Sequence, residues 1–198
     1  MVMLYPLEET ISRDQRITAM LQRPMVVWMT GLSGSGKSTL AVALERSLFE
    51  KGFKPFLLDG DTLRSGLNKD LGFSMNDRHE NIRRIAEVCK LMSDAGLIVI
   101  AAFISPFRSE RGFVRSLLPQ SDFAEVYVNG SLEKCESRDV KGLYKMARKG
   151  IIPEFTGIDS PYEPPMHPEL VINTDNEKEE ESLSRLLNFL LPKISLTL

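Results

Sequence analysis

The sequence predicts an α/β fold, with a parallel sheet of five strands covered by helices on both faces. Short apolar runs alternate with longer segments whose apolar residues recur at helical spacing, which is the pattern of strand–helix–strand units. The run 97–103 is wholly apolar, as in a central strand that is buried on both faces. The chain has 198 residues, 42% of them hydrophobic, which suits one domain with its own core.

Composition and charge exclude several classes of function. The formal net charge is −2, whereas domains that bind nucleic acids usually carry excess positive charge. Two cysteines are too few for a disulfide framework. No apolar run approaches the ~18 residues of a membrane span, and the acidic N-terminal segment is unlike a secretory leader. We therefore expect a soluble, cytoplasmic protein that binds a small anionic ligand, with no nucleic-acid or membrane partner.

The first 24 residues differ from the rest. Residues 1–24 have mixed charge and predict an N-terminal extension with a helix over 9–21, which Pro24 ends before the first strand. No residue type in this extension indicates chemistry, so packing or oligomer contact is its expected role. Residues 25–198 are predicted to form a single domain.

A glycine-rich loop follows the first apolar strand. Residues 31–38 match the spacing G-x-x-x-x-G-K-[ST] of a phosphate-binding loop, with a helix opening at Lys37. Glycines let successive backbone N–H groups point at one anion, and the helix dipole adds positive charge. We expect Lys37 to reach the β- and γ-phosphates of a nucleoside triphosphate and Ser38 to ligand Mg²⁺; a flexible Gly/Ser loop is the alternative. The predicted nucleotide-binding residues are Gly31, Leu32, Ser33, Gly34, Ser35, Gly36, Lys37, Ser38 and Thr39.

The remaining elements alternate along the chain. Apolar spacing and stop signals predict them in this order: helix 37–52, strand 55–58, helix 77–95, strand 97–103, helix 108–118, strand 124–128, a helical segment 132–150, a proline-rich loop 153–168, strand 170–172 and helix 177–191. In parallel sheets, ligands bind outside the carboxyl ends of the strands. Asp59-Gly60-Asp61 and Ser105-Pro106 follow two of these strands, so we expect them to share a cleft with the glycine-rich loop.

Each strand end offers a candidate group. Asp61, with Arg64 three residues on, is predicted to hold Mg²⁺ or to orient a hydroxyl nucleophile. Capping of the following helix is the alternative for Asp59 and Asp61. Ser105 is predicted to hydrogen-bond a substrate phosphate or to accept a phosphoryl group, with helix capping as the alternative.

The start of the helix 77–95 is a further cluster. Arg78 extends the apolar face of that helix toward the ligand edge, and Asn81 is close enough to join it. Phe73, in a loop next to glycine, is equally suited to stacking on a base and to filling the core. His79 is expected to be a solvated surface residue without a role.

Positive charge is concentrated between the fourth and fifth strands. In a phosphoryl-transfer enzyme, this is where a closing lid brings cations over the transferred group. We expect residues 138–165 to form such a lid, with Arg138 and Lys141 as its functional cations and Phe155 as a further aromatic residue. For Lys145 and Lys149, a solvated basic helix is the alternative.

These motifs together resemble the adenylylsulfate kinase (APS kinase) family. The likeness runs in order from about residue 13 to 174 and is carried by Gly-Leu-Ser-Gly-Ser-Gly-Lys-Ser-Thr, Asp-Gly-Asp, Leu-Gly-Phe-Ser, Asp-Arg-His-Glu-Asn-Ile-Arg-Arg, Phe-Ile-Ser-Pro, Arg-Asp-Val-Lys-Gly-Leu-Tyr and Phe-Thr-Gly-Ile-Asp-Ser-Pro-Tyr-Glu. The resemblance implies a three-layer P-loop kinase fold. It also implies transfer of the γ-phosphoryl group of ATP, with Mg²⁺, to the 3′-hydroxyl of adenosine 5′-phosphosulfate (APS), giving 3′-phosphoadenosine 5′-phosphosulfate in sulfate assimilation.

The resemblance also implies roles for single residues. Lys37, Asp61 and Ser105 match the catalytic positions, and Ser38 and Asp61 match the metal site. The family describes the position of Ser105 as a phosphoserine, but in-line transfer needs no protein nucleophile, so its mechanism stays open. The residues that match the APS site are Asp61, Arg64, Phe73, Arg78, Asn81, Ile104, Ser105, Lys141 and Phe155, with the two phenylalanines on either side of the adenine.

The likeness extends to assembly. Members of the family are usually homodimers, so we expect a dimer. Some members are fused to a sulfate adenylyltransferase, and for this chain a free enzyme and one domain of such a fusion are both open alternatives. Two other functions remain as alternatives. The first is another small-molecule kinase of the same fold, which would need different acceptor motifs. The second is a nucleotide-regulated switch, but Asn68-Lys69-Asp70 lacks the Asn-Lys-x-Asp spacing of a guanine-reading motif.

Overall fold

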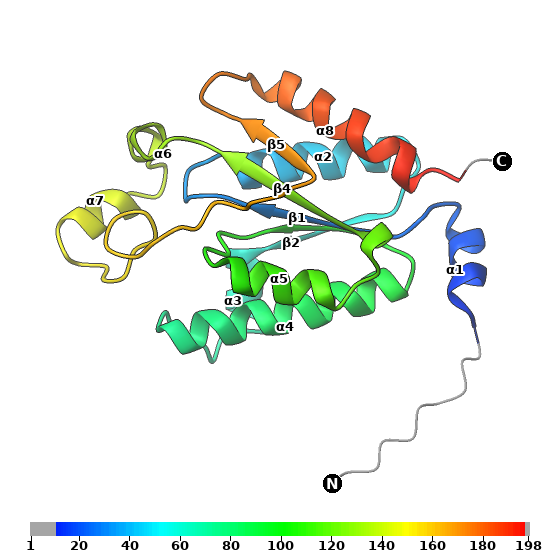
Figure 1. Ribbon diagram of the computed structural model, residues 1–198, viewed down its shortest axis with the longest axis horizontal. Helices are drawn as coiled ribbons and strands as arrows, with labels where there is room; N and C mark the ends of the chain where they lie inside the picture. The colour runs from blue at the N-terminus through cyan, green and yellow to red at the C-terminus, as the bar shows by residue number, and fades with distance from the viewer. Residues whose placement is uncertain (1–10, 197–198) are drawn as a thin grey trace, which may run out of the picture.

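The computed structural model describes residues 11–196 and has one parallel sheet at its centre (Figure 1). Its five strands are all parallel and lie in the order β2-β3-β1-β4-β5. They are β1 (Met25–Thr30), β2 (Pro55–Asp59), β3 (Ile98–Ala102), β4 (Phe123–Asn129) and β5 (Leu170–Asn173). The predicted fold class and all five predicted strands are therefore confirmed.

Helices cover both faces of the sheet, which gives three layers (Figure 1). One face packs against α2 (Lys37–Glu50) and α8 (Glu179–Ile194), and the other against α4 (Met75–Asp94) and α5 (Arg108–Ser116). The shorter helices are α1 (Arg13–Met20), α3 (Gly60–Ser65), η1 (Gln120–Asp122), α6 (Leu132–Arg138) and α7 (Leu143–Arg148).

The central strand β1 shows why the sheet is buried on both faces. All six of its residues are buried, and successive side chains point to opposite faces. Val27 and Met29 enter the core under α2 and α8, whereas Val26 and Trp28 enter the core under α4 and α5. An uninterrupted apolar run is what this two-sided burial requires.

The two edges of the sheet carry different structures. The strands point toward the edge where α6 and α7 lie, and α1 lies at the opposite, amino-terminal edge (Figure 1). The segment after α1 is tied to that opposite edge, because the Gln22 side chain donates to the Gly96 carbonyl at 2.8 Å and accepts from the Lys54 amide at 2.8 Å. The Arg23 amide donates to the Ile194 carbonyl at 2.7 Å. The part of the N-terminal extension that the structure describes is therefore distant from the ligand edge.

Several predicted boundaries differ from the structure. Helix α1 begins at Arg13, after a capping box at Ser12, and the predicted start at Glu9 lies outside the described residues. The predicted helical segment 132–150 is two helices, α6 and α7, separated at residues 139–142. Within residues 11–196, no helix is long and apolar enough to cross a membrane.

Candidate active site

The glycine-rich loop 31–36 joins β1 to α2 at the carboxyl edge of the sheet. Gly34 and Gly36 have φ values of +75° and +98°, which side chains rarely adopt. A Cβ atom at Gly34 would lie 2.9 Å from the carbonyl oxygen of Cys135, so this glycine also permits a close approach of α6. The loop therefore has the tight backbone that phosphate binding requires.

Lys37 is buried within this loop. Its ammonium donates hydrogen bonds to the carbonyl oxygens of Gly31, at 2.9 Å, and Leu32, at 2.7 Å. Burial lowers the pKa of Lys37 from 10.5 to about 8. The charged ammonium is therefore poorly compensated by the protein alone. A bound phosphate would supply the compensating negative charge. The exposed side chains of Ser38 and Thr39 stand beside it in the first turn of α2.

The two aspartates after β2, Asp59 and Asp61, have different contacts. Asp59 caps α3, because its carboxylate accepts from the amides of Asp61 at 2.9 Å and Thr62 at 3.3 Å, so the capping alternative is correct for this residue. Asp61 is exposed and forms an ion pair with Lys141. The structure thus brings a strand-end carboxylate and a cation of the predicted lid together.

Two arginines frame the next part of the site. The guanidinium of Arg64 lies 4.5 Å from the ring centroid of Phe73 and donates to the Gly72 carbonyl at 2.9 Å. Arg78 donates to the carbonyls of Phe73 and Glu154, both at 2.8 Å, and so links α4 to the lid loop. Burial and the neighbouring charge of Arg78 lower the pKa of Arg64. An anion between these cations would relieve their repulsion.

The other predicted contacts lie in different surroundings. Asn81 is buried, and its Oδ1 accepts from Asn68 at 2.9 Å. Phe155 is buried with its ring edge-on to Tyr144, at 5.0 Å between centroids. Phe73 is 67% exposed, although the guanidinium of Arg64 lies over its ring.

The segment predicted to be a lid packs directly on the glycine-rich loop. The Tyr144 hydroxyl donates to the Ser33 carbonyl at 2.9 Å, and Arg138 donates to the Gly34 carbonyl at 3.2 Å. Tyr144 and Phe155 also belong to a small apolar cluster that includes Leu32. The two remaining lid lysines are exposed: Lys145 and Lys149.

The loop after β3 is strained and buried. Ser105 has φ +37°, is 2% exposed, and its hydroxyl accepts a hydrogen bond from Trp28 Nε1 at 3.1 Å. The carbonyl of Ile104 accepts from Thr30 at 2.8 Å. Helix α5 is preceded by Phe107 as its cap, so the capping alternative for Ser105 is wrong. A strained residue held by several bonds is typical of functional sites.

Two residues near the site were not predicted from the sequence. Arg111 on α5 is buried, pairs with Glu125 at 2.7 Å and has its guanidinium 5.8 Å from the ring centroid of Tyr162. The signal for this cluster was Glu125 itself, a charged residue inside the apolar run 124–128, because a buried carboxylate needs a partner.

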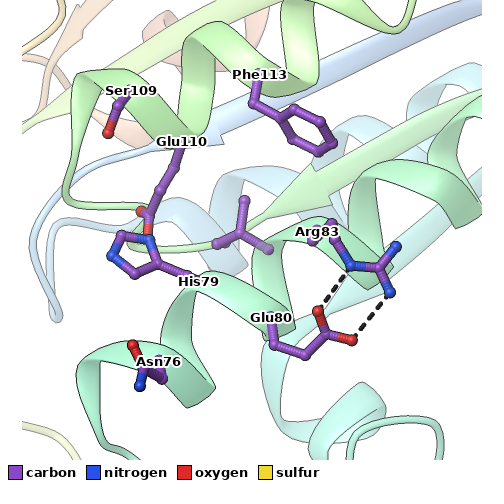
Figure 2. Close-up of a pocket in the computed structure, with 8 residues that line it drawn as sticks. Asn76, His79, Glu80, Arg83, Ser109, Glu110 and Phe113 are labelled. Carbon is purple, nitrogen blue, oxygen red and sulfur yellow. Dashed lines mark hydrogen bonds and ion pairs between the residues drawn. The ribbon is translucent and has the colours of Figure 1, made fainter.

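A separate hollow of about 420 Å³ lies between α4 and α5 (Figure 2). It is lined by Asn76, His79, Glu80, Ile82, Arg83, Ser109, Glu110 and Phe113, none of which is a predicted site residue. His79 is a solvent-exposed residue, as expected, but its Nδ1 also lies 2.8 Å from the buried carboxylate of Glu110, a contact that the sequence did not predict. Burial raises the pKa of Glu110.

The protein oxygens at the site suit a metal ion that takes most of its ligands from bound substrate and water. Among residues 11–196, no group of three or more His, Cys, Asp or Glu side chains is placed to hold a metal ion. Mg²⁺ is usually held by one or two protein oxygens together with substrate phosphates and water. The exposed oxygens of Ser38 and Asp61 suit that arrangement.

A parallel sheet with this loop after its central strand, and with α7 bonded to the loop at the same edge, has the fold of a P-loop kinase. The comparisons with known proteins are more specific. The model of the family described as adenylylsulphate kinase matches residues 23–173, which is most of the chain. This chain therefore belongs to the adenylylsulphate kinase family and is a kinase that binds ATP.

Individual relatives agree with this assignment. An adenylyl-sulfate kinase from Geotalea uraniireducens is 60% identical over 84% of this chain and 80% of its own length. The structure of the Mycobacterium tuberculosis APS kinase with AMPPNP and APS is 47% identical, covers 85% of this chain and 98% of its own, and has a TM-score of 0.82. A hexameric APS kinase from Thiobacillus denitrificans is 33% identical over 88% of this chain and 30% of its own, with a TM-score of 0.66.

Proposed function

We propose that this chain transfers the γ-phosphoryl group of ATP to the 3′-hydroxyl of adenosine 5′-phosphosulfate. The observation that carries the proposal is the ion pair of Asp61 and Lys141, within a chain of this family. The carboxylate of Asp61 is suited to orient the acceptor hydroxyl. The ammonium of Lys141, from the lid, is suited to neutralise charge on the transferred group. ATP and APS then meet at one edge of the sheet, under the lid.

The donor side of the reaction belongs to the glycine-rich loop. Backbone N–H groups of residues 31–39 hold the phosphates of ATP, and Lys37 moves from the loop carbonyls to the β- and γ-phosphates. Ser38 and Asp61 would supply the protein oxygens for Mg²⁺, which would neutralise negative charge on the phosphates. The lowered pKa of Lys37 supports this role, because the ammonium gains most from an anion where it is poorly solvated.

The acceptor side belongs to the second and third strand ends and to the lid. Arg64 and Arg78 bind the phosphosulfate, as their mutual repulsion favours an anion between them. The other contacts proposed for APS are Asn81, Ile104, Lys141, Phe73 and Phe155. The exposed ring of Phe73 is available to cover one face of the adenine, and Phe155 supplies the facing wall from the lid.

Asp61 is the group that orients the acceptor hydroxyl. Direct in-line transfer requires the hydroxyl oxygen and the γ-phosphorus to be positioned, and it requires no protein nucleophile. The hydroxyl of Ser105 is buried and bonded to Trp28, which argues against Ser105 as a phosphoryl carrier. We propose that Ser105 positions the substrate through its loop instead.

A coupled assay of ADP release tests the proposal. We expect ADP formation from ATP and Mg²⁺ to depend on APS, and Asp61→Ala to lower kcat by about 10³-fold, because a positioned acid or base contributes on that scale. Asp70→Ala is the matched control, since Asp70 is another exposed aspartate whose partner, Arg84, is not a proposed site residue. It should retain wild-type turnover.

The assay separates the possible failures. Stimulation by a different acceptor, with none by APS, would keep the kinase and reject the substrate. Turnover that no acceptor stimulates would favour the nucleotide-regulated switch. Equal loss in the Asp61 and Asp70 variants would remove Asp61 from the mechanism.

We also propose that the chain works as a homodimer in the cytoplasm. The family likeness supports the dimer. The cytoplasm supplies ATP and keeps thiols reduced, which agrees with the free, buried cysteines Cys89 and Cys135.

A further inference from the structure

Arg111 makes contacts in three directions from a buried position on α5. It is 3% exposed, and its Nε donates to Glu125 on β4 at 2.7 Å. Nη1 donates to the carbonyl of Ser105 at 2.6 Å, and Nη2 donates to the carbonyl of Glu163 at 2.6 Å. One guanidinium therefore joins the sheet, the loop after β3 and the end of the lid.

The first of these loops is a wall of the proposed acceptor site. Ser105 holds a φ of +37°, a conformation that persists only where surrounding contacts fix it. Thr30 donates to the carbonyl of Ile104, and Trp28 donates to the hydroxyl of Ser105. Arg111 donates to the carbonyl of Ser105. The loop is thus held from three sides.

The second loop carries the lid back to the sheet. The Glu163 amide donates to the Pro106 carbonyl at 2.9 Å, and the Glu163 carboxylate accepts from the Arg108 amide at 2.8 Å. The Tyr162 hydroxyl lies 2.9 Å from Thr30 Oγ1, and its ring faces the guanidinium of Arg111. The end of the lid is therefore fastened to the same loop that Arg111 holds.

We propose that Arg111 is a positioning residue for the acceptor nucleotide. It fixes the loop after β3 and the end of the lid relative to each other. The inference rests on the proposed function, in which Ile104 and Ser105 form one wall of the acceptor site while Lys141 and Phe155 come from the lid. Arg111 touches neither nucleotide in this scheme. Its effect reaches APS through the two loops, and its three hydrogen bonds go to Glu125, Ser105 and Glu163 rather than to the glycine-rich loop.

Only arginine suits this position. Its planar guanidinium directs separate N–H groups at three acceptors, whereas the lysine ammonium is a point charge on a flexible chain. Lysine still balances the buried charge of Glu125. Arg111→Lys therefore avoids leaving that carboxylate unpaired, which would endanger the fold.

The kinetic test compares Arg111→Lys with Arg115→Lys. Arg115 lies one turn later on α5 and also contacts Glu125, at 3.5 Å, but its other partner is Glu169. We expect Arg111→Lys to raise KM for APS about tenfold, through loss of charge-assisted hydrogen bonds, with KM for ATP within about twofold of wild type. Arg115→Lys should change neither constant.

A second readout needs no substrate. Trp28 is the only tryptophan in the chain, and its indole N–H donates to the Ser105 hydroxyl. Fluorescence of the ligand-free protein therefore reports on the loop after β3. Arg111→Lys should move the emission to longer wavelength, because a looser loop admits water to the indole, whereas Arg115→Lys should leave the emission unchanged.

The results for Arg111→Lys test the positioning role, and the turnover of the wild type tests the proposed function. A folded Arg111→Lys protein with wild-type emission and wild-type KM for APS overturns the positioning role, as does an equal rise of KM for both substrates. If the wild type shows no APS-dependent turnover, the proposed function fails, and unchanged emission of Arg111→Lys would then reject the positioning role as well. If Arg111→Lys does not fold, Tyr162→Phe carries the test, since it removes only the hydroxyl contact with Thr30 and should raise KM for APS alone.

Discussion

Glu110 is a buried acid whose charge is poorly balanced. Its carboxylate is almost inaccessible, and its nearest ionisable partner is the imidazole of His79, at 2.8 Å beside the hollow between α4 and α5 (Figure 2). Burial is the main cause of its raised pKa, and the charges of His79 and Arg111 oppose the rise in part. The charged form of Glu110 is therefore disfavoured in the folded protein.

Replacing Glu110 by glutamine should change how stability depends on pH. A group whose pKa is raised by folding favours the native state below its unfolded pKa of 4.5 and loses that contribution as the pH rises through the folded value. The free energy of unfolding of Glu110→Gln, relative to that of wild type at the same pH, should therefore increase from pH 5 to pH 8. Urea denaturation at both pH values measures this difference.

Glu80 provides a control of opposite sign in the same hollow. Its bonds with Arg83 and Arg84 lower its pKa to about 2, so its charged form stabilises the folded protein. Glu80→Gln should lose stability relative to wild type above pH 4.5. A difference between Glu110→Gln and wild type that stays constant from pH 5 to pH 8 would contradict the assignment for Glu110.

At the level of elements, α7 and the glycine-rich loop form one hydrogen-bonded unit. Tyr144→Phe removes the bond to the Ser33 carbonyl and keeps the ring against Phe155. One such bond contributes about 1 kcal/mol, so we expect Kd for ATP to rise about fivefold. Arg148→Gln, which breaks an exposed ion pair with Glu136 on the same helix, is the control and should leave Kd unchanged. Calorimetric titration of ATP would contradict the coupling if both variants bind like wild type.

The elements also show where sequence patterns are sufficient and where they are not. Apolar runs located every strand. Two-sided burial leaves a strong signal in β1, β3 and most of β4, and the edge strands β2 and β5 keep short apolar runs although they are partly exposed. The division of the segment 132–150 was missed, although Gly142, with φ +67°, lies inside it. The carboxylate of Asp139 accepts from the amides of Tyr144 and Lys145, at 3.1 and 3.0 Å, and so starts α7 anew. Helical spacing on both sides concealed this local capping.

At the scale of the whole molecule, sheet topology explains which site residues could be found in advance. Carboxyl ends of parallel strands share an edge, and this rule alone grouped the glycine-rich loop with Asp61 and Ser105. Contacts between the lid and the sheet depend on how a long loop returns, which no local pattern records. Tyr162 was missed for that reason, whereas Arg111 on α5 had a signal only in its partner, the charged Glu125 within an apolar run.

Assembly is the remaining prediction at this scale. We expect sedimentation velocity to give the mass of two chains at micromolar concentration, as the family likeness implies. Runs with and without ATP and APS serve as controls for ligand-dependent association. A single-chain mass at every concentration, or the mass of six chains, would contradict the dimer.

The opposite placement of the ligand edge and of α1 has a practical consequence. Helix α8 ends beside Arg23, and α1 lies at the same edge, so both ends of the described chain face away from the lid (Figure 1). An affinity tag, a surface anchor or a second catalytic module could be joined at either end without crossing the path of the nucleotides. The same geometry would allow immobilised protein to keep its lid free to open.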